Sequence, residues 1–90
     1  MVDIVTNTLR NEAREAVEAS VRAAIALRPG LWQVTLLGSH RVERFVVFIR
    51  HPEAGFNRSW VFGSLQDPVQ RTIEDGLAEA GIDRSFDYPA

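Results

Sequence analysis

Few residues in this chain have the types and spacing that catalysis or metal binding requires. The chain contains two histidines, His40 and His51, and no cysteine, which excludes disulfides, thiolate nucleophiles and zinc–thiolate sites. The histidines flank one predicted strand, and at about 3.3 Å per residue they would lie roughly 30–36 Å apart, too far to share a metal ion. Ser39 precedes His40, but neighbours in a turn supply neither triad geometry nor an oxyanion hole. We therefore expect no metal site and no catalytic triad.

The sharpest motif is Arg50-His51-Pro52-Glu53, at the end of a hydrophobic stretch. It resembles the Arg-His-Gly-Glu signature of the histidine phosphatase and phosphoglycerate mutase family. The resemblance implies a histidine that attacks phosphorus and an arginine that holds phosphate. It covers residues 48–53 only, Pro52 stands where that family has glycine, and the second histidine that the family needs does not follow. A nucleophile without its acid and phosphate pocket is not a catalytic site, so we predict that His51 is a loop residue and that the protein is not an enzyme.

The composition indicates one small domain. The chain has 90 residues, 46% of them hydrophobic, which is enough for one modest core. We expect a single domain over residues 1–90, with residues 83–90 as a C-terminal tail. Apolar runs are too short to span a bilayer, no secretory signal is recognisable at the start, and no glycine-rich phosphate loop is present. We expect a cytoplasmic protein with no cofactor.

Hydrophobic spacing predicts a helix near each end of the chain. Residues 9–27 carry apolar or small side chains three and four positions apart, which is typical of an amphipathic helix. Asp67 as N-cap, with Gln70 as its capping-box partner, predicts the start of a second helix, and Gly81 predicts its end. Gly76 within this helix predicts a close backbone contact with the first helix or the sheet. The stripe of the first helix is predicted to be Leu9, Ala13, Ala16, Val17, Ser20, Ala24 and Leu27.

Between the helices the period changes to two, which predicts strands at residues 31–37, 42–50 and 58–63. Short connections favour antiparallel pairing, with residues 42–50 in the centre because they are apolar on both faces. The predicted fold is a two-layer αβββα sandwich of the α+β class, with a three-stranded antiparallel sheet and both helices packed on one face. Its buried sheet face is predicted to consist of Trp32, Val34, Leu36, Phe45, Val47, Ile49, Trp60 and Phe62.

The second face of this sheet is the first candidate binding surface. With both helices on the other side it remains uncovered, although the tail aromatics Phe86 and Tyr88, or residues 2–5, could also cover it. A contiguous apolar patch rimmed by arginine suits an interface. The predicted partner-binding residues are Leu37, Arg44, Val46, Phe48, Arg50 and Val61, with Gln33 and Thr35 beside them.

The acidic end of the chain is the second candidate surface. The net charge is −2, with a mildly basic middle and an acidic end, and every cation is arginine. Such a helix face is usually only solvated, but it could also dock on a basic partner or mimic a phosphate backbone. Its predicted residues are Asp67, Glu74, Asp75 and Glu79.

These features predict a non-enzymatic protein-binding module. It would be either a small adaptor that self-associates as a homodimer or a small inhibitor that occupies a partner's surface. Acidic nucleic-acid mimicry is one way in which such an inhibitor could work. The alternative is a nucleic-acid-binding module, because the order of elements resembles the double-stranded RNA-binding domain in topology. That family grips phosphates with a lysine-rich cluster at the second helix, where this chain has residues 66–71 followed by Glu74 and Asp75. Nucleic acid would therefore have to bind the open sheet face, through Arg44, Arg50 and Phe48.

Overall fold

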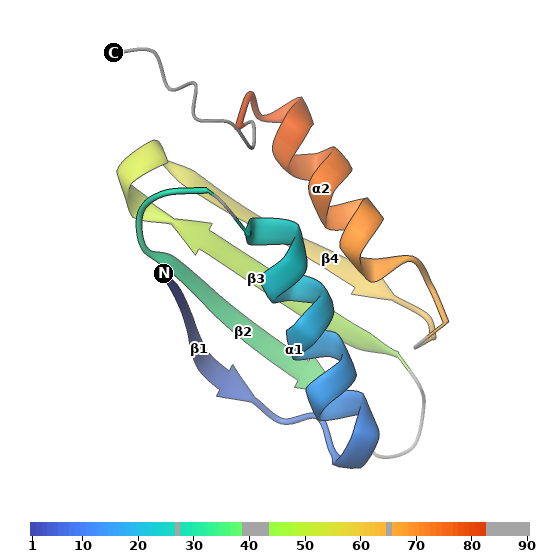
Figure 1. Cartoon of the computed structure of the whole chain (residues 1–90). Helices are drawn as coiled ribbons and strands as arrows, with labels where there is room; N and C mark the ends of the chain where they lie inside the picture. Colours follow the sequence, from blue (N-terminus) through green and yellow to red (C-terminus); the bar gives the residue numbers. More distant parts are fainter. Residues whose placement is uncertain (27, 39–43, 65, 83–90) are drawn as a thin grey trace.

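The computed structural model describes residues 1–26, 28–38, 44–64 and 66–82. It is a small α+β fold in which two helices lie side by side on one face of a sheet (Figure 1), as predicted. None of the helices in these ranges is long and apolar enough to cross a bilayer. The elements are β1 (Val2–Asn7), α1 (Asn11–Ile25), β2 (Trp32–Gly38), β3 (Phe45–His51), a 3₁₀ turn (Pro52–Ala54), β4 (Phe56–Phe62) and α2 (Val69–Glu79).

The sheet has four strands and is mixed, so the predicted three-stranded antiparallel sheet is wrong. The strand order is β1-β2-β3-β4, with β1 parallel to β2 and the other pairs antiparallel. The additional strand is β1, where Val2 and Ile4 pack against the core while Asp3 and Val5 are exposed. This short alternation is that of a half-buried strand, and α1 provides the crossover that a parallel pair requires.

The core lies between the helices and one sheet face, and it consists largely of the residues that the period-two pattern predicts. Every predicted sheet residue is buried except Trp60, which is half-buried. In α1 the buried stripe is rotated from the predicted one: Val21 and Ile25 are fully buried, whereas Ala16 is exposed. The larger aliphatic side chains gain more from burial than Ala and Ser do, so they decide the orientation of the helix.

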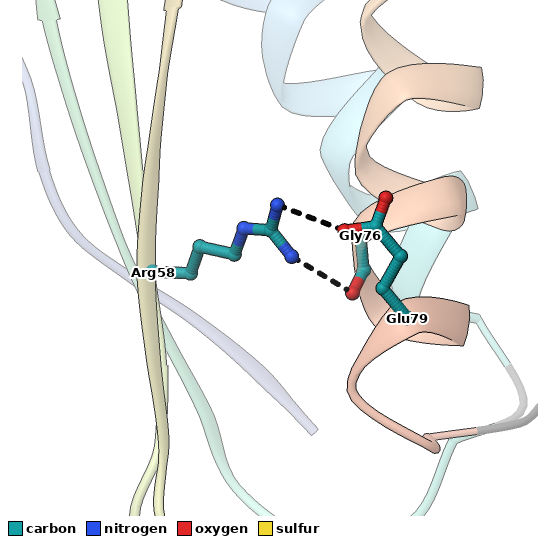
Figure 2. A network of polar contacts seen from close by, with 3 residues as sticks. All are labelled: Arg58, Gly76 and Glu79. Carbon is teal, nitrogen blue, oxygen red and sulfur yellow. Dashed lines mark hydrogen bonds and ion pairs between the residues drawn. The ribbon is translucent and has the colours of Figure 1, made fainter.

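Helix α2 is held against β4 by Gly76, Trp60 and Arg58. A Cβ atom on Gly76 would lie 2.6 Å from Cζ2 of Trp60, so glycine permits the close approach, as predicted. Figure 2 shows Arg58 reaching from β4 to α2, where Nη1 donates to the Gly76 carbonyl (3.3 Å) and Nη2 pairs with Oε1 of Glu79 (3.1 Å). The Arg58 guanidinium also lies 5.6 Å from the centre of the Trp60 ring.

The two ends of α2 differ in how well the sequence predicts them. The C-terminal end is confirmed: Gly81 has φ +79°, its N–H donates to Ala78, and the N–H of Ile82 donates to Leu77, which is a Schellman motif. The predicted capping box is wrong, because α2 has no side-chain cap. Asp67 instead accepts hydrogen bonds from the backbone of the β4–α2 turn. The predicted tail, residues 83–90, and the predicted hairpin residues Ser39, His40 and Arg41 lie outside the described residues.

Candidate functional site: the open sheet face

Strand register arranges the open sheet face, the side of the sheet away from the helices, in rows that run across the strands. At one end Leu37 pairs with Val46, and Val46 pairs with Val61, so three aliphatic side chains lie next to each other. Their neighbours along each strand point to the other face and fill the core. Val61 is 65% exposed and Leu37 is 40% exposed. This end of the face is therefore an apolar row in contact with solvent.

The middle row contains the largest exposed side chain of the face. Phe48 pairs with Thr35 on β2 and Ser59 on β4, and its side chain is 40% exposed. The neighbours of Phe48 on the same strand, Val47 and Ile49, are fully buried on the opposite face. Strand β3 thus carries apolar side chains on both faces, and only one of these faces is filled by the helices.

The third row is polar and contains a cation. Arg50 pairs with Gln33 on one side and Asn57 on the other, so two amides flank its guanidinium-bearing side chain. Asp3 of β1 pairs with Gln33 and extends the row. Both Arg50 and Asp3 are exposed. The face therefore grades from aliphatic at one end, through Phe48, to hydrogen-bonding and charged groups at the other.

A shallow depression of about 530 Å³ lies over the aromatic and polar rows. Phe48 and Arg50 form its apolar and cationic parts, and the side chains around them can donate and accept hydrogen bonds. Arg44 is exposed immediately before β3 and adds a second cation near the apolar end. The depression is lined by Val5, Gln33, Thr35, Phe48, Arg50 and Asn57.

The structure brings the six predicted partner-binding residues to the positions that strand alternation requires, all of them exposed or half-buried. One of the two predictions for what covers the open sheet face is wrong: residues 2–5 belong to β1, which lies beside β2 in the sheet and not over the face. The other cover, Phe86 and Tyr88, lies outside the described residues. The contributions of Asn57 and Ser59 were missed, although they alternate with Arg58 and Trp60 in the sequence and could have been found from that alternation.

The four predicted acidic residues are near α2 but do not act as one uniform surface. Asp67 Oδ2 accepts hydrogen bonds from the N–H groups of Gly63 (2.9 Å) and Ser64 (3.3 Å). Glu79 pairs with Arg58, and Glu74 accepts a hydrogen bond from the Gln70 amide. Asp75 is exposed. At least three of these carboxylates therefore have local structural partners.

His51 is not a loop residue, which corrects the prediction. It ends β3, is only 6% exposed, and stacks on Trp32 with ring centroids 4.1 Å apart and planes inclined by 12°. Its Nδ1 donates to the carbonyl of Leu31 at 2.8 Å. Arg50 is exposed on the opposite face of the same strand, because neighbouring strand residues point to opposite sides. The two residues therefore cannot act on one phosphate as the phosphatase-like motif would require.

Within the described ranges no group of three or more histidine or acidic side chains could hold a metal ion. The chain matches no protein-family model, and neither a curated protein nor a solved structure is detectably similar to it.

Proposed function

We propose that this protein is a non-enzymatic protein-binding module, an adaptor or a small inhibitor, whose working surface is the open sheet face. One observation carries the proposal: the exposed row of Leu37, Val46 and Val61, with Phe48 beside it, lies on strands whose other face is already filled by the helices. The largest apolar patch on a soluble protein is often functional, and an apolar centre with a polar rim is the composition of an interface.

Charge favours a different protein over a second copy as the occupant of this face. Arg44 and Arg50 are exposed there, and within the described residues Asp3 is the single acid of the face. The face is therefore locally positive in a chain of net charge −2. A second copy stacked on it would bring a positive surface against a positive surface. A partner that presents carboxylates on either side of an apolar strip would be complementary.

The size of the face supports a reversible complex. Four strands about 4.8 Å apart and about six residues long give a projected area of roughly 400 Å². A stable interface usually buries about 800 Å² on each partner. The face alone therefore suits a transient partner, or one that also reaches the neighbouring loops. We also propose that the complex forms in the cytoplasm, because a chain without cysteine needs no oxidising compartment in order to fold.

Single-stranded nucleic acid is the second candidate ligand, on the strength of one observation. Phe48 is an exposed ring between two exposed arginines, and such an arrangement can stack a base while the guanidinium groups contact phosphates. The net charge is negative, and among the described residues Phe48 is the one aromatic ring on this face, so nucleic acid is the weaker candidate.

Photochemical crosslinking distinguishes these proposals. Phe48 is replaced by p-benzoylphenylalanine, and the purified variant is irradiated in an extract of the source cell. The matched control carries the same photoreactive residue in place of Arg71, which is exposed on α2 in the other layer. We expect a protein adduct that forms from position 48, resists nuclease and is absent from the control. A nuclease-sensitive adduct would support the second candidate, and equal adducts from both positions would contradict the open face as the working surface.

A further inference from the structure

The two edges of the sheet are protected to different degrees. At one edge, β1 carries a register shift between Ile4 and Thr6 and an exposed Asp3. Bulges and charges are two of the devices by which proteins prevent an edge strand from pairing with another chain. At the other edge, β4 pairs with β3 over all seven of its residues without a shift. The β4 edge therefore lacks the irregularity that β1 has.

The side chains of β4 do not protect its edge either. The strand contains no proline, and its one charged residue is Arg58. The Arg58 guanidinium is turned toward α2, where it binds the Gly76 carbonyl and Glu79 (Figure 2). Among the described strands β4 has a neighbour on one side only, so every second backbone N–H and C=O group of the strand faces away from the sheet. This is a regular, seven-residue template for a further strand.

We propose that a second copy of this chain pairs with the β4 edge in antiparallel orientation, with Ser59 at the twofold axis. Antiparallel pairing of identical strands gives a closed, symmetric dimer. With Ser59 opposite itself, Phe56 meets Phe62, Asn57 meets Val61 and Arg58 meets Trp60 of the second copy. No like charges are opposed, all seven residues are paired, and the smallest polar side chain of the strand lies where the two copies meet.

The pairing would also bring the α2 helices of the two copies side by side. Helix α2 lies on the β4 side of α1 (Figure 1), where it contacts Trp60 and Arg58 of β4. With strands about 4.8 Å apart, an α2 axis midway between β3 and β4 would lie roughly 10 Å from that of the second copy, an ordinary distance for packed helices. Both helical layers would then be on the same side of a continuous eight-stranded sheet.

The pairing would also join the open faces of the two copies. Phe48 and Ser59 lie in one row, and the twofold axis continues that row into Ser59 and Phe48 of the second copy. The two Phe48 rings would be three strand spacings apart, about 14 Å, on one face of double the area. This doubled binding face rests on the proposed function, whereas the pairing itself does not.

Solution mass of the full chain, measured by light scattering over a range of concentrations, tests the pairing. We expect a dimer for the wild type. Ser59→Lys and Ser59→Glu each place like charges opposite each other at the axis, which should raise the dimer dissociation constant roughly fivefold or more. Mixing the two variants should restore a dimer. The matched control is Thr35→Lys, a charge in the same row on the internal strand β2, which should leave the dimer intact.

A second variant uses the absence of cysteine from the chain. Ser59→Cys should form an intermolecular disulfide under mild oxidation, because directly opposed antiparallel residues have Cα atoms about 4.5–5.5 Å apart, within disulfide range. Thr35→Cys should not. A monomeric wild type, an unchanged mass for Ser59→Lys, or loss of the dimer in Thr35→Lys would overturn the pairing. Phe48→Asp should remain dimeric, so a failure of the edge pairing and a failure of the open-face proposal give different results.

Discussion

Replacing Gly76 with alanine tests whether the Trp60 ring sets the distance between α2 and the sheet. In an exposed helix interior this change stabilises by about 1 kcal/mol, because glycine is the poorer helix former. Here the new Cβ would lie 2.6 Å from Cζ2 and 3.2 Å from Cε2 and Nε1 of Trp60. Overpacking of this kind typically costs about 1–3 kcal/mol. We therefore expect Gly76→Ala to lower the free energy of unfolding by roughly 0–2 kcal/mol.

A double-mutant cycle with Trp60→Leu separates the two effects. Leucine removes the ring atoms that the Cβ would meet, so Gly76→Ala should become stabilising by about 1 kcal/mol in that background. The assay is urea unfolding followed by circular dichroism, at one fixed protein concentration because any dimer makes stability depend on concentration. Ala78→Gly, at an exposed position of α2, is the control and should cost about 1 kcal/mol in both backgrounds. If Gly76→Ala stabilised both backgrounds equally, the contact between Gly76 and Trp60 would not limit the packing.

Three further substitutions test the core. Phe45→Ala should lower the free energy of unfolding by about 3–5 kcal/mol, because the ring is 1% exposed and stacks on Phe62; a loss below about 1 kcal/mol in urea unfolding would mean that the buried face is misassigned. His51→Ala should lower the free energy of unfolding by about 2–3 kcal/mol, because the stacking on Trp32 and the hydrogen bond to Leu31 are lost. Neither the wild type nor this variant should hydrolyse a phosphate monoester in a colorimetric assay, and phosphohistidine trapped at His51 would refute this. Arg28→Met should lower the free energy of unfolding by about 1–3 kcal/mol in thermal and urea unfolding, because the buried guanidinium donates to the carbonyl of Ala24, in the last turn of α1, and to that of Ile82, shortly after α2. An unchanged stability would contradict that role.

The two layers of the fold could be predicted from the sequence because apolar periodicity is a local property. Trp32, Val34 and Leu36 alternate with polar residues, and the core side of their strand follows from that alternation alone. The end of α2 at Gly81 was predictable for a similar reason, since its positive φ favours glycine. Strand β1 was missed because only Val2, Asp3 and Ile4 alternate in polarity, whereas Val5 is apolar but exposed and the register shifts between Ile4 and Thr6.

Contacts between distant segments could not be predicted in this way. The rows on the open sheet face depend on the register of β2, β3 and β4, which is set by pairing and not by any one strand. Arg58 binds Gly76 and Glu79, which lie eighteen and twenty-one positions away along the chain. His51 follows a strand and precedes Pro52, which predicts a loop, but stacking on Trp32 and the hydrogen bond to Leu31 extend the strand through it. In each case tertiary packing decides the outcome.

Phe48 and the aliphatic row beside it are proposed to bind a partner protein. The most direct test is the affinity of Phe48→Asp for the partner that crosslinks at position 48, measured by calorimetry after near-ultraviolet circular dichroism has verified the fold. A buried charge at the centre of an interface typically costs at least 2 kcal/mol, so we expect binding to weaken about thirtyfold or more. Ala16→Asp, an exposed position of α1, should bind as the wild type does. A folded Phe48→Asp variant with wild-type affinity would show that the partner does not bind at Phe48.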